Sequence, residues 1–236
     1  MEGEKMDEKI LKQKGKPSLE DKLNTLRAGV LGSNDGILTV VGVLFSVAVA
    51  TTDQFTIFIA GLADLLACAF SMASGEYASV SAQRDTEKAA VITENELLKT
   101  SFAAELNEVV KFYQAKGVSE KTAQQIAEDL MHQKPLETII NVKYNLKLGS
   151  YFNPWNAAFS SLFSASAGGI FPLAAMTLSP DNFKWIATIL AVCLSVSLTG
   201  YLSARLGNGL TKIAIFRNLI VGIITMIIHY TVGIML

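Results

Sequence analysis

The chain has 236 residues, of which 50% are hydrophobic and 17% are charged, and its formal net charge at pH 7 is −1. This near-neutral balance gives no support for nucleic-acid binding, and its two cysteines, Cys68 and Cys193, lack the paired spacing of a disulfide framework or a zinc site. Seven of the 20 Lys and Arg residues lie in residues 1–27 and nine lie in residues 82–153. Long apolar blocks therefore alternate with polar ones, which is typical of an integral membrane protein.

Five apolar segments are long enough to cross a bilayer, which takes about 20 residues in a helix. In chain order they are residues 28–50, 55–81, 154–178, 183–204 and 213–236. The third segment is rich in Ser, Ala and Gly, and such small residues let membrane helices pack closely. We therefore predict an all-α polytopic membrane protein, with its first two transmembrane helices in residues 28–81 and the other three in residues 154–236.

The polar stretch at residues 82–153 has the pattern of a folded domain rather than of disorder. The apolar residues that predict its first helix by their spacing are Phe102, Leu106, Val109, Val110 and Tyr113. Gly117 ends this helix, Ser119 is the expected N-cap of a second, and Pro135 begins a third. The expected buried face of the second helix consists of Ile126, Leu130 and Met131. We predict a three-helix domain inserted between the second and third transmembrane helices.

The basic residues predict an orientation in the membrane. If the first two spans form a hairpin, residues 1–27 and 82–153 lie on one side and together hold 16 of the 20 Lys and Arg residues. That side is cytoplasmic by the positive-inside rule, so the C-terminus is expected outside or in a lumen. Because the charged N-terminal residues lack the apolar centre of a signal peptide, a bacterial cell membrane is the first expected location and a vacuolar membrane the second.

Asp35 is the only charged residue of the first predicted span. Gly32 and Gly36 stand on either side of it and form a small-xxx-small pattern. An ionisable side chain at this depth costs about 3 kcal/mol on insertion scales, so it needs a partner, water or a function. Two interpretations follow: Asp35 is a hydrogen-bonded residue in a tight helix contact, or its carboxylate lines a pathway where another helix comes close.

The second predicted span contains Asp64, Cys68, Met72 and Glu76, each four residues after the last. Steps of four turn the position by about 40° on a helix, so these side chains form a drifting stripe. Carboxylates bind divalent cations, and a thioether biases a site toward late transition metals such as Fe(II). The two spans contain no Lys or Arg, so we expect their acids, Asp35 included, to be neutralised by a bound cation or by protons rather than by internal ion pairs.

The inserted stretch contains a second acidic group, formed by Glu94, Glu96, Glu105 and Glu108. Glu105 and Glu108 are three residues apart and share a helix face, where a cation between them would relieve their repulsion. We expect a cytoplasmic metal-binding site here, and a solvated acidic surface is the alternative. His229 in the fifth span has no spacing partner and is expected to be structural.

Four stretches of the sequence have a family resemblance. They are "LRAGVLGSNDGIL", "AGLADLLACAFSMASGEYASVSAQRDTE", "NPWNAAFSSLFSASAGGIFPL" and "FRNLIVGIITMIIHYTVGI". These stretches resemble the first, second, third and fifth helices of the vacuolar iron transporter family. The resemblance extends over the chain from about Thr25, and five spans with a helical insert after the second is also the layout of that family.

The resemblance implies a homodimeric transporter that moves Fe(II), Mn(II) or both out of the cytoplasm in exchange for protons. It implies a translocation path through Asp35, Asp64 and Met72, to which we add Glu76 near the cytoplasmic entrance. It also places metal-gathering glutamates at positions 94, 105 and 108. The expected partners are metal ions, protons and membrane lipid, with no organic cofactor. We expect no enzyme, because the chain lacks an HExxH motif and a nucleophile–base pair. The alternative is a membrane metal-binding or regulatory protein of the same family that does not transport.

Four positions of the insert depart from the pattern of the family. Leu97 stands where the family often has another metal-binding glutamate, and Lys147 replaces an acid. Lys143 and Tyr144 take the positions of two methionines. A lysine disfavours a cation beside it. The cytoplasmic site is therefore expected to be weaker, rebuilt around Glu94, Glu96, Glu105 and Glu108, or unused.

Overall fold

The structure is a computed structural model that describes residues 19–149 and 151–235. Residues 1–18 of the predicted N-terminal segment, and the last residue of the fifth predicted span, lie outside the described residues. The described part of the chain is built of α-helices and contains no β-strand. The prediction of an all-α protein is therefore confirmed.

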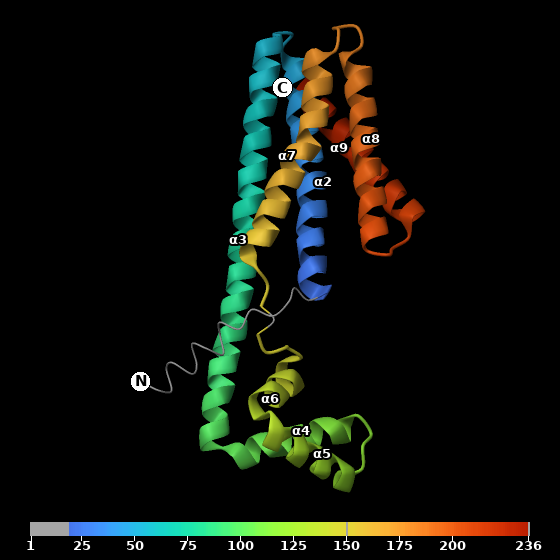
Figure 1. Cartoon of the computed structure of the whole chain (residues 1–236). Coiled ribbons are helices and arrows are strands. Elements are labelled where there is room, and N and C mark those ends of the chain that lie inside the picture. The colour runs from blue at the N-terminus through green and yellow to red at the C-terminus, as the bar shows by residue number, and fades with distance from the viewer. Residues whose placement is uncertain (1–18, 150, 236) are drawn as a thin grey trace. The chain divides into compact units, whose positions relative to one another are not determined.

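Five long helices contain the apolar segments (Figure 1). They are α2 (Leu19–Ala50), α3 (Gln54–Thr100), α7 (Pro154–Leu178), α8 (Lys184–Leu206) and α9 (Thr211–Met235). Each is long and apolar enough to cross a membrane, which confirms the five predicted spans. Asp53 caps the start of α3, because its Oδ2 atom accepts a hydrogen bond from the Thr56 amide at 2.9 Å.

The chain divides into two compact units. The first, called here the membrane unit, consists of residues 22–80 and the chain from residue 153 onward. The second, called the insert unit, contains residues 81–152. The helix α3 contributes residues to both, since it runs without interruption from Gln54 to Thr100.

The membrane unit has its apolar core around α2. The buried residues of this core in α2 include Ile37, Val40, Val41, Leu44 and Phe45. They pack with buried side chains of the other four long helices, such as Leu65, Leu173, Val196 and Met226. Large apolar side chains of α8 and α9 remain exposed, which suits helices that face lipid.

The helices α2 and α7 touch through their backbones. A Cβ atom added at Gly32 would lie 2.7 Å from the carbonyl oxygen of Ser161, and one added at Gly169 would lie 2.7 Å from the carbonyl oxygen of Gly36. Side chains larger than hydrogen do not fit at these distances. The small-xxx-small pattern around Asp35 therefore marks a close helix contact, as the sequence predicts.

The insert unit is a small helical bundle. Its helices are α4 (Phe102–Ala115), α5 (Glu120–Gln133) and α6 (Pro135–Tyr144), and Val91 of α3 joins their core. The predicted helix ends are confirmed: Gly117 has φ +87°, the Ser119 hydroxyl accepts a hydrogen bond from the Thr122 amide at 3.4 Å, and Pro135 occupies the first turn of α6.

The buried face of α5 differs from the predicted one. Ala123, Ala127 and Met131 are buried, whereas Ile126 is partly buried and Leu130 is 36% exposed. The prediction was wrong at Leu130 because it weighed hydrophobicity and not size. Two alanines let the neighbouring helices come close to α5, and this contact excludes the larger side chains.

Candidate functional site

Asp35 of α2 faces Cys68 of α3 inside the membrane unit. The Cys68 thiol donates a hydrogen bond to Oδ2 of Asp35, with 3.7 Å between sulfur and oxygen. Both side chains are partly buried. The contact places a polarizable sulfur atom beside a carboxylate within two apolar spans.

Asp64 lies one helical turn before Cys68 on α3 and is also partly buried. Its Oδ2 atom is buried and accepts no hydrogen bond within the described part of the chain. Asp35 and His229 of α9 lie near enough to act on it electrostatically, and Thr39 of α2 lies beside it. The Thr39 hydroxyl is therefore the donor within reach of this carboxylate, and a cation, a proton or water would further stabilise its buried charge.

Glu76 departs from the expectation that the acids of the spans have no internal partner. Its carboxylate is buried and lies 3.4 Å from a guanidinium nitrogen of Arg27. Arg27 did not count as a basic residue of the first span, because that span was predicted to begin at residue 28. The helix α2 begins at Leu19 and includes Arg27. The expectation of a cation or proton is therefore wrong for Glu76, and it stays a prediction for Asp35 and Asp64.

The four residues of the predicted path do not converge on one point. Asp35 and Asp64 are neighbours, whereas Met72 is partly buried and lies eight residues beyond Asp64, which is about 12 Å along a helix. Among the residues that the structure describes, no three His, Cys, Asp or Glu side chains are grouped closely enough to hold a metal ion. Asp64, Met72 and Glu76 therefore form a series along α3, with Asp35 of α2 near Asp64, rather than a closed cage.

A cavity of about 330 Å³ lies between α2, α7 and α8. Its lining includes the hydroxyl groups of Ser33, Ser164 and Thr199 and apolar side chains such as Ile37 and Phe171. None of the predicted metal ligands lines it. The cavity offers no carboxylate and is not a candidate metal site.

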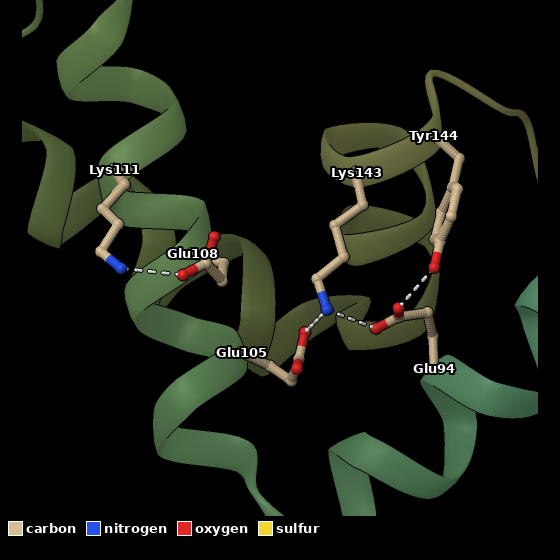
Figure 2. Close-up of polar contacts among 6 residues, drawn as sticks. All are labelled: Glu94, Glu105, Glu108, Lys111, Lys143 and Tyr144. Atoms are coloured by element: carbon tan, nitrogen blue, oxygen red, sulfur yellow. Dashed lines mark hydrogen bonds and ion pairs between the residues drawn. The ribbon is translucent and has the colours of Figure 1, made fainter.

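The insert unit brings two of its four predicted glutamates together (Figure 2). Glu94 of α3 is 1% exposed and Glu105 of α4 is 5% exposed. The Lys143 ammonium of α6 lies between them, with Nζ 2.8 Å from Oε2 of Glu94 and 2.5 Å from Oε2 of Glu105. The Tyr144 hydroxyl donates a hydrogen bond to Oε1 of Glu94 at 2.9 Å. The two buried carboxylates therefore converge on a lysine.

The other two predicted glutamates stay outside this cluster. Glu96 is exposed, and Glu108 is exposed and pairs with Lys111 at 2.9 Å. The hydrogen bond and the charge of Lys111 lower the pKa of Glu108. The solvated acidic surface that sequence analysis kept as an alternative therefore describes these two positions.

The pKa values of the cluster follow from its contacts. Burial alone would lower the pKa of Lys143, but its hydrogen bonds to Glu105 and Glu94 and the charges of both outweigh burial and raise that pKa. The hydrogen bond to Glu94, with burial, raises the pKa of Tyr144. Both side chains are therefore protonated donors near neutral pH.

Three of these contacts are not apparent from the sequence: Cys68 with Asp35, Arg27 with Glu76, and Lys143 with the two buried glutamates. Only the last had a signal in the sequence, because Lys143 and Tyr144 depart from the family pattern at adjacent positions.

The fold and the site define a multi-pass α-helical membrane protein that holds carboxylates on neighbouring helices inside its spans. Comparison with known proteins agrees with this class. The model of the VIT family matches residues 26–234. The vacuolar iron transporter of Acanthamoeba castellanii is 33% identical over 209 residues, which cover 88% of this chain and 77% of that protein.

Two plant proteins are also similar. Vacuolar iron transporter homolog 1 of Oryza sativa subsp. japonica is 29% identical over 213 residues, or 88% of this chain and 72% of that protein. Vacuolar iron transporter homolog 2.1 of Arabidopsis thaliana is 28% identical over 185 residues, or 78% and 68%. The chain belongs to the VIT family, whose members are transporters and not enzymes.

Proposed function

We propose that this chain is a transporter that moves a divalent metal ion, Fe(II) or Mn(II) or both, out of the cytoplasm in exchange for protons. The relatives named as vacuolar iron transporters support iron as the transported ion. Within this proposal the path runs along α2 and α3 through Asp35, Asp64, Met72 and Glu76. A homodimer, as the family resemblance implies, is part of the same proposal.

The observation that supports this function best is the pair of carboxylates at Asp35 and Asp64. They lie on two apolar helices, and neither makes an ion pair with a Lys or Arg in the described residues. Glu76 on the same helix shows the contrast, because Arg27 neutralises it. Two neighbouring carboxylates without a Lys or Arg partner, with the His229 imidazole as the basic group that acts on Asp64, favour a bound proton or cation, and a transporter that exchanges the two uses both states.

The path residues have different roles in this mechanism. Glu76 and Arg27 lie nearer the polar part of α3 and orient the entrance. Asp35 and Asp64 replace part of the water shell of the ion, while the Met72 thioether favours Fe(II) over harder cations. Protons from the opposite side then compete for the same carboxylates and release the metal.

The proposal also fixes an orientation. Residues 1–27 and 82–153 would be cytoplasmic, and the spans would lie in residues 28–81 and 154–236, because 16 of the 20 Lys and Arg residues fall in the two polar segments. Of the two expected locations, a bacterial cell membrane and a vacuolar membrane, the names of the relatives support the second. We do not extend the path to the four insert glutamates, because Lys143 binds two of them.

The test is metal flux into proteoliposomes that contain the purified chain. We expect uptake of Fe(II) and Mn(II) to rise when a pH gradient is imposed. Asp35→Asn and Asp64→Asn should each lower the rate about tenfold or more, since each removes a charged ligand and keeps the shape. Met72→Leu should lower Fe(II) uptake more than Mn(II) uptake. Asp85→Asn, which changes an exposed acid of α3, is the matched control and should transport normally.

One alternative remains with an observation of its own: a membrane metal-binding or regulatory protein that does not transport. The ion pair of Lys143 with the insert glutamates favours it, because a metal-gathering role there is compromised. Binding of Fe(II) without flux under any pH gradient would establish this alternative. Wild-type flux in Asp35→Asn would instead contradict the assigned path.

A further inference from the structure

The buried carboxylates of Glu94 and Glu105 form a cluster that needs a positive charge. They come from different helices, α3 and α4, and both are almost fully buried. Two neighbouring carboxylates without a counter-charge are strongly destabilising away from water, because each loses its hydration and repels the other. Some cation must therefore be present when the insert unit is folded with both groups ionised.

Lys143 supplies this charge from a third helix. Its ammonium contacts one oxygen of each carboxylate, and it stands in the last turn of α6, where a positive charge is favoured by the helix dipole. Glu105 stands in the first turn of α4, where a negative charge is favoured. The charges of the cluster thus agree with the helices that hold them.

The carboxylate oxygens of Glu94 are already occupied and are not available to bind a metal ion. Oε2 of Glu94 is bound by Lys143 and Oε1 by Tyr144, so both oxygens of this carboxylate already accept hydrogen bonds. A divalent ion at this place would have to displace the ammonium and the phenol. Glu96 and Glu108 offer no replacement, because both are exposed and Glu108 pairs with Lys111. The residues therefore do not fit the cytoplasmic metal-binding site expected from the sequence.

We propose that the Lys143 ammonium is a built-in cation that joins α3, α4 and α6, so that the insert unit folds without metal and does not bind a divalent metal ion. The Tyr144 hydroxyl binds Oε1 of Glu94, the oxygen that Lys143 does not contact, and so orients the ion pair between Lys143 and Glu94. This inference does not depend on transport, because it concerns the insert unit alone. It predicts that removal of the ammonium makes the cluster dependent on an external cation.

The test uses the full chain in detergent micelles and amide hydrogen exchange, followed in peptides of the insert unit. Exchange in wild-type α3 (after residue 81), α4 and α6 should be unchanged by a chelator and by added Mn(II). Lys143→Met should speed exchange there by about a hundredfold or more, because it leaves a buried charge without its partner. Added Mn(II) should restore protection in this variant. Lys147→Met removes an exposed lysine of the same segment and should behave as wild type.

A second variant separates charge from packing. The double variant Lys143→Met with Glu105→Gln removes one positive and one negative charge, and it should regain protection without metal. If it exchanges as fast as Lys143→Met alone, the lysine does not act by neutralising the carboxylates, and the proposal is wrong. The proposal is equally overturned if Mn(II) slows exchange in the wild-type insert and Glu94→Gln abolishes this effect. Because the readout is local to the insert, neither result depends on the path in the membrane.

Discussion

Gly36 of α2 packs directly against the backbone of α7, and it follows Asp35 in the chain. A Cβ atom at this position would overlap the carbonyl oxygen of Ala165 and would lie 2.9 Å from its Cα atom. These are backbone atoms, which cannot turn aside as a flexible side chain can. A methyl group at position 36 must therefore move one helix away from the other.

We predict that Gly36→Ala lowers the free energy of unfolding by about 1–3 kcal/mol, as overpacking does in close-packed interiors. It should also lower metal flux, because the shift of α2 displaces the carboxylate of Asp35. Equilibrium unfolding in mixed micelles measures the first effect. Gly75→Ala is the control: nothing lies within 4 Å of its Cβ position, so better helix propensity should leave stability equal or raise it by up to about 1 kcal/mol. Equal stability of Gly36→Ala and wild type would contradict the close contact.

At this scale the sequence indicates which residues are unusual but not which ones meet. An acid such as Asp35 in an apolar run is conspicuous, since its insertion is costly. Its contact with Cys68 depends on the rotation of two helices about their axes, and no pattern within either helix determines that rotation. The same holds for Lys143, whose distance from Glu94 in the chain hides their contact.

The helix α5 shows how small residues determine packing in the insert unit. Ala127 is fully buried, together with Ala123 and Met131, against the core formed by α4 and α6. Leu130, one of the larger apolar residues of this helix, is partly exposed on another face. A space that fits a methyl group does not accept a leucine without a shift of the neighbouring helix.

Hydrophobicity alone would predict that adding apolar atoms to α5 stabilises the insert unit and that removing them destabilises it. We expect the reverse order of stability for one substitution on each face of α5. Ala127→Leu adds apolar atoms but should destabilise the insert unit by about 1–3 kcal/mol. Leu130→Ala removes apolar atoms but should change stability much less, because part of the side chain is in water. The rate of trypsin cleavage within residues 102–144 of the full chain reports the opened insert unit. Faster cleavage of Leu130→Ala than of Ala127→Leu would contradict this packing, because it would show that the face with Leu130 is the buried one.

The long elements were the easiest to predict, because a run of about 20 apolar residues allows few structures other than a membrane helix. The ends were harder. The start of α2 at Leu19 was missed, since its first turns are polar and have no apolar run to mark them. This single omission also hid the partner of Glu76, because Arg27 lies in the missed turns.

Over the whole molecule, the Lys and Arg residues are divided even more unequally between the two sides of the membrane than the first two spans alone suggest. If the five helices cross the membrane in turn, the α8–α9 connection at residues 207–210 lies on the same side as residues 82–153. Arg205, Lys212 and Arg217 flank this connection and join the 16 Lys and Arg residues already assigned to that side. Lys184 alone is left near the other side, and by the positive-inside rule this distribution supports the proposed cytoplasmic placement of the insert.

The orientation can be measured with single cysteines at exposed positions in cells that express the chain in their surface membrane. A membrane-impermeant maleimide should label Thr52→Cys and Asn182→Cys in intact cells, because these exposed positions lie between spans on the side that the proposal makes the outer one. Lys116→Cys and Leu210→Cys should be labelled only after the membrane is opened. The native Cys68 and Cys193 lie within the spans, so the unsubstituted chain supplies the background signal. The reverse pattern would invert the proposed direction of transport, and labelling of Lys116→Cys and Thr52→Cys from one side would rule out a crossing by α3.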